Sequence, residues 1–505
     1  ASLETAVQEA LEIAAERARR LGRPVLASVV TALGEVPRRG LWAAAAREEA
    51  ARERRVLLAA PDGEPALVGL GVAWSLAASG PDRFEAVRAA FEHVAAEAVC
   101  LGEASVPGTG MVATGAFRFD PERPPGAGWE GVADADLFIP RLLLTWPGPS
   151  ETAYLTINIP AAPQGDGHGL AAQALACAWD LVRAARGASD GAAGSAGSDS
   201  TAWETPQQLP DPAGDGARWT ELVGLAVQAI RQGRFHKVVL ARAEEVLAPG
   251  PLRLPGLVGA LAQSCPACAR FLLTLPGRGG GGWWLGATPE RLVTCRADGT
   301  LRALALAGSA PRAPSADADA ALARSLMASP KQQAEHRWVV DAVRRALEPL
   351  VTALEVPERP GVLRLPDVQH LCTPITGRLR PGRSVTDVVK ALHPTPAVGG
   401  FPREAALRWL RAHEGFDRGW YAAPVGWWDA YGNGDFWVGI RSARLLADPG
   451  PGAPVRATLY AGCGIVADSR PEDEWAESTL KLRPMRRLLA QVGLLQEAGA
   501  RRAAV

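Results

Sequence analysis

The stretch AGCGIVADSRPEDEWAESTLKL (residues 461–482) combines the two patterns that decide the fold of this chain. Its first part is an apolar strand pattern, in which Gly462 and Gly464 mark either a plain bulge or a close approach of the backbone to a ligand. Ser469 and Glu472 then have the spacing of a helix capping box, and the proline between them suits a first helical turn. The stretch therefore predicts a strand followed directly by an amphipathic helix.

The predicted helix places three charged side chains on one face. Glu474, Glu477 and Lys481 stand at positions i, i+3 and i+7, so they share one stripe. Such a stripe is either a solvated surface or a cation site beside an anion contact. A hard cation needs further oxygen ligands, and Glu335, which opens a second amphipathic pattern, is a candidate to supply them.

Lysine is scarce in this chain, so each lysine is informative. Of 54 Lys and Arg residues, only four are lysines: Lys237, Lys331, Lys390 and Lys481. Lys237 lies in the strand pattern 235–242, both faces of which are mostly apolar. A desolvated lysine has a lowered pKa and serves as a base or nucleophile. A strand-end lysine that extends its ammonium group to water is the simpler interpretation of this strand taken alone.

Two further residues suggest a site for an anionic substrate. Glu290 follows a Thr-Pro turn, where it is either a general acid held protonated by an apolar wall or a glutamate at the start of a helix. The segment 420–443 is a hairpin signal around Gly-Asn-Gly, and Arg441 follows its second apolar strand. A guanidinium in an apolar environment needs an anionic partner, and a substrate carboxylate is one option.

The composition excludes several classes of function. The 54 acidic residues balance the 54 basic ones, which argues against a nucleic-acid binder. No long uncharged apolar run predicts a membrane helix, and no secretory signal is visible at the start, so we expect a cytoplasmic protein without a membrane partner. Seven dispersed cysteines fit a reducing compartment. The only CxxC, Cys265 to Cys268, lacks a second pair for zinc and a thioredoxin-like context, and is interpreted as two small buried thiols.

The chain alternates strand and helix patterns without a repeat. Residues 56–75 predict two strands around an Asp-Gly turn, and residues 82–105 predict a helix. Residues 186–216, rich in Gly, Ser, Asp and Pro, predict a flexible linker. We therefore expect an N-terminal half at 1–185, a linker at 186–215 and a catalytic half at 216–495.

Nine segments in this order resemble the chorismate-utilising enzymes, the family of anthranilate synthase component I. They are KVVLAR (237–242), GATPERL (286–292), ALAGSAPR (305–312), EHRWVVD (335–341), HLCTPITG (370–377), LHPTPAVGGFPR (392–403), GWYAAPVGWW (419–428), VGIRSARL (438–445) and residues 461–482. The resemblance implies an α+β fold: one large mixed domain with antiparallel β-sheets sandwiched together and helices packed outside. Nine ordered blocks are far more specific than any single motif.

A few side chains indicate which activity the resemblance implies. Anthranilate synthases carry Gln where Lys237 stands and use ammonia, so the resemblance implies water as the nucleophile. Aminodeoxychorismate synthases place a nucleophilic Lys where Ala307 stands here, and no glutaminase domain or subunit is expected. The block Ala305–Ser309 is most similar to isochorismate synthases, which add water at C2 of chorismate and remove the C4 hydroxyl. Salicylate synthases, which usually read PLAGT there, are the alternative.

The resemblance also assigns roles to individual residues. Lys237 would be the base, with a depressed pKa, and Glu290 the acid, with a raised one; His393 would lie near the leaving group. Mg²⁺ would bind Glu335 and Glu477, with Glu474 nearby. The residues expected to contact the two carboxylates or the rest of chorismate are Tyr421, Arg441, Lys481, Gly308, Ser309, Gly462, Cys463 and Gly464.

Several questions stay open from the sequence. The isochorismate would feed menaquinone, which the long N-terminal half favours, or a catecholate siderophore. A non-enzymatic binder of aromatic carboxylates is the rival from another class, and the complete set of charged residues argues against it. The resemblance implies a monomer.

Overall fold

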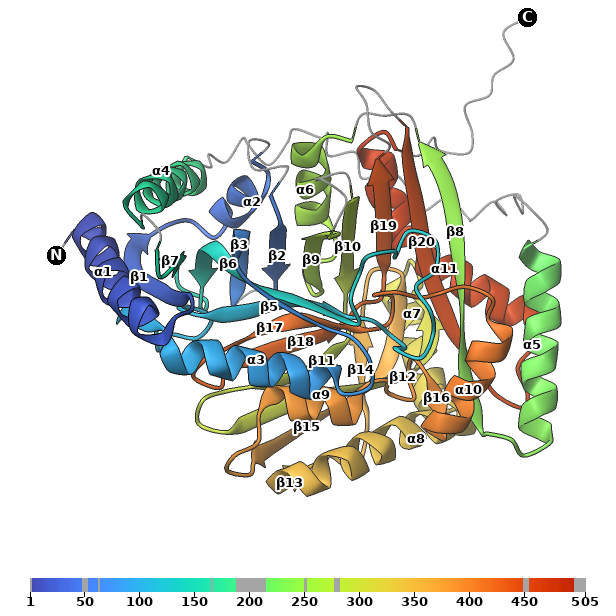
Figure 1. Cartoon of the computed structure of the whole chain (residues 1–505). Coiled ribbons are helices and arrows are strands. Elements are labelled where there is room, and N and C mark those ends of the chain that lie inside the picture. Colours follow the sequence, from blue (N-terminus) through green and yellow to red (C-terminus); the bar gives the residue numbers. More distant parts are fainter. Residues whose placement is uncertain are drawn as a thin grey trace, which may run out of the picture.

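The computed structural model describes residues 2–47, 53–61, 64–164, 167–187, 215–248, 252–276, 282–447 and 454–494. These residues form β-sheets in which strands from the two halves of the sequence pair with one another, and helices surround the sheets (Figure 1). Among the described residues, none of the helices has the length and hydropathy needed to span a membrane.

A first sheet runs through the strands of both halves. In spatial order its strands are β4 (Val99–Gly102), β1 (Val25–Glu35), β7 (Thr152–Ala161), β6 (Ala135–Trp146), β3 (Ala66–Ala78), β2 (Arg55–Ala59), β9 (Ala269–Thr274), β10 (Gly282–Thr288), β19 (Ser442–Ala447), β20 (Val455–Ile465), β8 (Lys237–Ala248) and β16 (Gly400–Phe401). Every neighbouring pair is antiparallel except β1 with β4. The halves join where β2 pairs with β9, with Val56 opposite Leu273.

A second sheet branches from β6 and is also built from both halves. Its order is β6, β5 (Val112–Phe117), β17 (Pro424–Asp429), β18 (Gly434–Val438), β11 (Arg291–Cys295), β12 (Thr300–Pro311) and β15 (Val368–Leu379), with β13 (Val351–Glu355) and β14 (Gly361–Arg364) also paired to β15. Because strands of both halves pair within each sheet, the two halves share one framework, while the domain boundaries drawn from the sequence stay a prediction.

Alternation of side chains along each strand fills two cores. In β9, Phe271 contributes to the core that also holds Phe138 and Phe436, from the second sheet. The next residue, Leu272, points to the other face of the first sheet and joins the second core, as the two-residue period of a strand requires. This arrangement confirms the predicted sandwich of antiparallel sheets.

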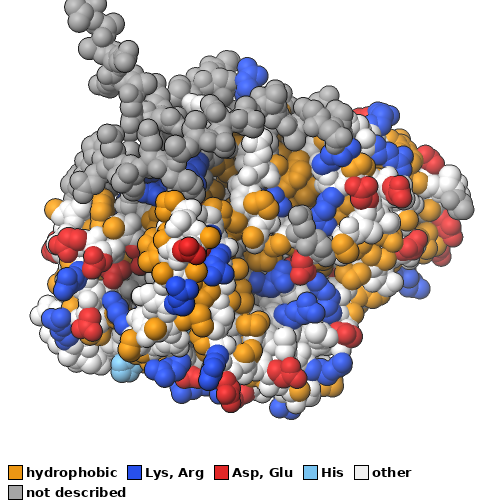
Figure 2. All heavy atoms as spheres, turned by 180° about the vertical axis from the view of Figure 1, so that it is seen from behind, with side chains coloured by type: hydrophobic (Ala, Val, Ile, Leu, Met, Phe, Trp, Pro, Cys, Tyr) orange, Lys and Arg blue, Asp and Glu red, His pale blue; other side chains and the backbone are white. Residues whose placement is uncertain are grey.

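Helices cover the outer faces and edges of the sheets (Figure 1). The second core is closed by α1 (Leu3–Leu21), α2 (Gly40–Ala45), α4 (Gly167–Arg186), α6 (Leu254–Gln263) and α11 (Pro471–Gln491). The others are α3 (Arg83–Glu97), α5 (Asp215–Arg231), α7 (Ala316–Ala328), α8 (Pro330–Leu347), α9 (Val385–Leu392), α10 (Arg403–His413) and the 3₁₀ turn η1 (Glu348–Leu350). Seen from behind, basic and acidic side chains are interspersed, in keeping with the balanced charge (Figure 2).

The local expectations are mostly confirmed, with two corrections. The helix predicted for residues 82–105 is shorter than expected, since α3 ends at Glu97 and Val99–Gly102 form β4. β2 and β3 occupy the segment 56–75, whose Asp-Gly turn lies outside the described residues, as does the predicted linker from 188 to 214. The strand-to-helix step at 461–482 is β20 followed by α11. The capping box is wrong: α11 begins after Arg470 without a side-chain cap. The Ser469 hydroxyl instead accepts the backbone N–H of Val466 at 3.1 Å and so fixes the preceding turn.

Candidate active site

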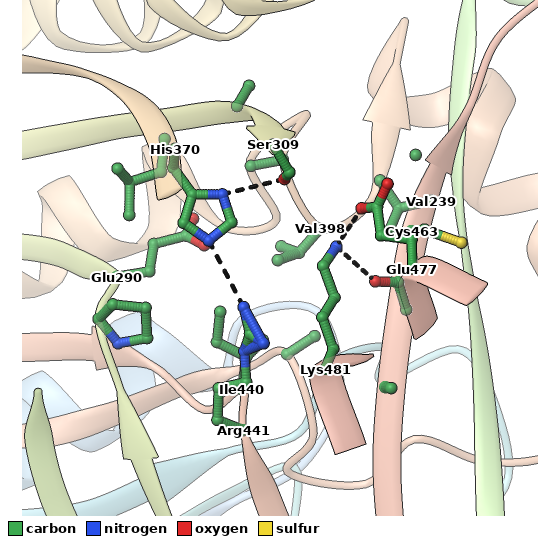
Figure 3. Close-up of a pocket in the computed structure, with 18 of the residues that line it drawn as sticks. Val239, Glu290, Ser309, His370, Val398, Ile440, Arg441, Cys463, Glu477 and Lys481 are labelled. Atoms are coloured by element: carbon green, nitrogen blue, oxygen red, sulfur yellow. Dashed lines mark hydrogen bonds and ion pairs between the residues drawn. The ribbon is translucent and has the colours of Figure 1, made fainter. Parts of the chain in front are cut away.

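A cavity opens where β8, β20 and β12 meet α8 and α11. Twelve of the residues expected at the site line it: Lys237, Glu290, Gly308, Ser309, Glu335, Tyr421, Arg441, Gly462, Cys463, Gly464, Glu477 and Lys481. Glu474 and His393 are not among the lining residues. Segments separated by more than two hundred residues thus converge on one chamber (Figure 3).

Lys237 is buried and paired inside the cavity. Only 2% of the residue is exposed, so its ammonium group does not extend to water. The Nζ atom donates to Oε1 of Glu335, on α8, at 2.6 Å. Gly464 leaves the room for this pair, since a Cβ atom there would lie 2.6 Å from Cε of the lysine and 2.9 Å from the glutamate oxygen. The glycine in the strand pattern therefore marks a close approach, one of the two alternatives left open by the sequence.

A second lysine and glutamate pair lies across the same cavity. Lys481 Nζ is 2.6 Å from Oε1 of Glu477, one helical turn earlier on α11, and donates to the Gly462 carbonyl at 2.9 Å (Figure 3). Burial acts to raise the pKa of Glu477, but the Lys481 charge and hydrogen bond outweigh it and lower that pKa. This face of α11 is therefore part of a charged cavity wall.

Glu290 has the surroundings of a carboxylic acid that keeps its proton. It lies two residues after the end of β10, and the Thr288 hydroxyl accepts its backbone N–H at 3.2 Å. Burial raises the pKa of Glu290 to about 7, although the charges of Lys237, Lys481 and Arg441 act to lower it. A carboxyl group with a pKa near 7 is suited to proton donation at neutral pH.

Arg441 is a buried cation in need of an anion. It is 7% exposed and adopts a left-handed backbone conformation with φ of 51°. Within the described part of the chain its guanidinium makes no ion pair with a carboxylate, and one of its nitrogens lies 3.5 Å from His370 Nε2. Because a buried unpaired guanidinium is costly, this arrangement favours an anionic ligand in the cavity. Tyr421, stacked on Tyr460 with ring centroids 5.2 Å apart, lines the cavity near it.

The structure adds a histidine that the sequence reading did not single out. His370, on β15, lies between Ser309 and Arg441, and its Nδ1 is 3.0 Å from the Ser309 hydroxyl (Figure 3). Burial, reinforced by the Arg441 charge, lowers the pKa of His370 well below its usual value. A neutral imidazole therefore connects the two groups. Its position inside the HLCTPITG block was the available signal.

His393 lies elsewhere. It ends α9 as the C-cap residue, its Nε2 is 3.0 Å from the carbonyl oxygen of Phe119, and its ring meets that phenyl edge-on at 5.7 Å. His393 is therefore not among the residues that line the cavity, and its role near the leaving group stays a prediction. The Nε2 atom of this imidazole is hydrogen-bonded to a backbone carbonyl of the loop that follows β5.

The sequence of this chain matches one protein family over most of its length. A family model described as chorismate binding enzyme matches residues 10–490. The chain belongs to the chorismate-binding enzyme family. Among the members of this family, the salicylate biosynthesis isochorismate synthase of Pseudomonas aeruginosa is 40% identical over 434 residues, covering 86% of this chain and 85% of that protein. The isochorismate synthase MenF of Bacillus subtilis is 33% identical over 376 residues, with 74% of each chain covered.

Solved structures of this family share the fold. The menaquinone-specific isochorismate synthase MenF from Escherichia coli superposes with a TM-score of 0.68 at 25% identity, covering 96% of this chain and 100% of that one. Anthranilate synthase component I from Streptococcus pneumoniae superposes with a TM-score of 0.62, covering 84% and 92% of the two chains at 20% identity, which shows the fold alone. The family and fold implied by the nine segments are thus confirmed.

Proposed function

We propose that this chain is an isochorismate synthase, an isomerase that converts chorismate to isochorismate. The observation that carries the proposal is that three groups line one cavity. They are the buried amine of Lys237, the carboxyl of Glu290 with its raised pKa, and the guanidinium of Arg441, which has no carboxylate partner among the described residues. The two relatives compared over most of their length bear the name isochorismate synthase, which supports the same conclusion.

The reaction requires a base that removes a proton from the attacking water and an acid that gives a proton to the departing hydroxyl. Lys237 takes a proton from water as the water oxygen bonds to C2 of the ring, the double bonds shift, and the C4–O bond breaks. Glu290 gives its proton to the departing hydroxyl, which leaves as water. Since a neutral amine is required, the Lys237 ammonium must first lose one proton to solvent, which ends its ion pair with Glu335. The atoms balance as an isomerisation, and solvent exchange restores both groups.

The cavity also supplies positive charge for a dicarboxylate. Arg441 lacks a carboxylate partner in the described structure, and Lys481 lies beside the backbone carbonyl of Gly462. Both line the chamber with Tyr421. We assign Arg441 and Tyr421 to one carboxylate of chorismate, with Lys481 as a further ammonium contact. Ser309, Gly308 and the strand residues Gly462, Cys463 and Gly464 form the remaining walls.

Mg²⁺ is the cofactor that we propose for Glu335 and Glu477. Their carboxylate oxygens suit a hard divalent cation and line the cavity from two different helices. No three Asp, Glu, His or Cys side chains of the described residues form a ready metal cluster, so substrate and water oxygens would complete the shell. Burial, to which the Glu477 charge adds, raises the pKa of Glu474, and a nearby cation would stabilise its ionised form. When bound, the ion supplies charge for the ring carboxylate.

Removal of divalent cations should abolish turnover. We expect the rate of chorismate consumption to fall by about 100-fold or more after chelation, because one main source of charge for the ring carboxylate is lost. Added Mg²⁺ should restore the rate of the wild type but not of the Glu477→Gln variant. An undiminished rate in buffer shown to be metal-free by elemental analysis would reject the cation site.

The product of the reaction tests the proposed function. Purified chain with chorismate and Mg²⁺ should accumulate isochorismate, resolved chromatographically and consumed by added isochorismate lyase. Salicylate with pyruvate as the end product would identify a salicylate synthase, the alternative that the sequence left open. Recovery of unchanged chorismate would support the non-enzymatic binder.

For the pathway, we propose that the isochorismate feeds menaquinone rather than a siderophore. The gene should then complement a strain whose menaquinone pathway is disrupted at this step, and not one whose siderophore pathway is disrupted.

A further inference from the structure

A second cavity lies behind the substrate-binding arginine. It has a volume of about 240 Å³ and shares two lining residues, Arg441 and Pro289, with the active-site cavity. Most of its surface is apolar, contributed by α6, the segment before β15 and α11. Its wall also contains both cysteines of the CxxC motif, Cys265 and Cys268. The CxxC motif, to which the sequence analysis assigned no function, thus lies beside the arginine that is proposed to bind a substrate carboxylate.

The two cysteines close a tight turn between α6 and β9. The backbone N–H of Cys268 donates to the carbonyl of Cys265 at 3.0 Å, and Pro266 occupies the second position of this four-residue turn. Such a turn holds its first and last Cα atoms within about 7 Å, close to the range that a disulfide bridges. The reduced turn is therefore already shaped for an S–S bond.

The two thiols differ as an attacking and a resolving thiol should. Cys265 is partly exposed, whereas Cys268 is 3% exposed. The hydrogen bond from the Cys268 thiol, followed by backbone N–H groups and the charge of Arg270, lowers the pKa of Cys265 to about 7. The pKa of Cys268 is raised, first by that same hydrogen bond and then by burial. A reactive thiol in an accessible place beside a second, protected thiol is the usual arrangement of a redox pair.

We propose that Cys265 and Cys268 form a reversible dithiol–disulfide site that controls the affinity of the neighbouring active site for its substrate. The oxidant is a small-molecule disulfide, RSSR. The Cys265 thiolate attacks one of its sulfurs and releases RS⁻, giving a mixed disulfide; Cys268 then loses its proton to solvent and attacks the Cys265 sulfur, releasing a second RS⁻. Both thiolates are protonated by solvent, so two cysteine thiols are oxidised and one RSSR is reduced to two RSH.

The sheet links this turn to the catalytic groups. Ala269, the residue after Cys268, is paired with Thr288 across β9 and β10. Two residues beyond Thr288 is Glu290, and the neighbouring N–H of Ala287 donates to the Arg441 carbonyl at 3.1 Å. Closing the disulfide joins the two side chains covalently and tightens the turn next to this strand pair. Oxidation should therefore weaken the hold on the substrate, an effect that rests on the proposed function.

The test compares reduced and oxidised full-length chain in the presence of glutathione disulfide. Peptide mass mapping should find the Cys265–Cys268 disulfide, two hydrogens lighter than the dithiol. The KM for chorismate should rise about fivefold or more and return after dithiothreitol. Cys268→Ser should stop at a glutathione adduct on Cys265, whereas Cys265→Ser should leave this turn unmodified. Cys177→Ser, which removes an exposed thiol on α4, is the matched control and should behave as wild type.

Two outcomes would overturn the proposal. The first concerns wild-type chain in which the exposed Cys100 and Cys177 have already reacted with the oxidant. If Cys265 and Cys268 are then still reduced, or if only a glutathione adduct on Cys265 is found, the proposal is wrong. The other is a complete disulfide with unchanged KM and unchanged chorismate binding by calorimetry. Because the mass and the binding measurements need no turnover, failure of the proposed isomerase activity would be seen separately.

Discussion

Replacement of Lys237 by glutamine should lower isochorismate formation by roughly 10²- to 10⁴-fold, the range in which positioned general bases contribute. The side chain is buried at the first position of β8 with its ammonium 2.6 Å from Glu335. Glutamine keeps a polar group of similar length but cannot accept a proton from water. We expect the loss in kcat rather than in KM, because Lys237 is assigned to the attacking water and not to a substrate carboxylate.

The control for this variant is a lysine outside the chamber. Lys390 pairs with Glu85 at the surface, where both side chains are over 40% exposed, and Lys390→Gln should leave the rate unchanged. Ammonium should be added to the Lys237→Gln reaction as well, because the resemblance to anthranilate synthases implies ammonia as the nucleophile where glutamine stands at this position. A wild-type rate of isochorismate formation by Lys237→Gln would show that the base lies elsewhere.

Replacement of Glu290 by glutamine should remove the activity and, above neutral pH, stabilise the fold. Burial raises the pKa of this carboxyl to about 7 in the folded chain, above its ordinary value of 4.5. The folded state therefore binds this proton more tightly than the unfolded state, and the free energy of unfolding falls as pH rises from 4.5 to about 7. Glutamine cannot ionise, so the variant avoids this cost, on the order of 3 kcal/mol at pH 8.

Two measurements check the Glu290→Gln prediction. Denaturant unfolding of wild type and variant should give similar stabilities near pH 4.5 and a more stable variant at pH 8. The rate of the wild type should decline as pH rises through about 7, because the acid loses its proton. Glu92→Gln, at a side chain 65% exposed on α3, should change neither. If variant and wild type have the same free energy of unfolding at pH 8, ionisation of the buried Glu290 carboxyl does not destabilise the fold as we expect.

The sequence predicts local elements better than their partners. The alternation in 56–75 and the turn signal in 420–443 correctly predict β2, β3, β17 and β18, because strand period and turn chemistry are local. The pairing of Val56 with Leu273, or of Thr114 with Trp427, joins residues hundreds of positions apart. Such pairings depend on how both cores are filled, and only the family resemblance carries that information.

The same limit explains the result for the site. Twelve expected residues share the cavity, yet the strand around Lys237 could not decide between a buried and a solvated amine. The burial of the amine depends on its ion pair with Glu335 and on the space left at Gly464, and both residues belong to elements distant in the sequence. His393 and His370 both stand in family-like blocks. Which imidazole faces the chamber depends on the packing of Phe119 and β15, which no local pattern encodes.

The origin of the C2 hydroxyl tests the central claim most directly. The reaction should be run in water enriched in ¹⁸O, with isochorismate analysed by mass spectrometry at low conversion, before the reverse reaction relabels chorismate. If Lys237 activates water for attack at C2 and Glu290 releases the C4 hydroxyl, each isochorismate molecule should carry one solvent oxygen. Unlabelled isochorismate would contradict the account, because the hydroxyl would then have moved within the substrate without the water that the site is proposed to activate.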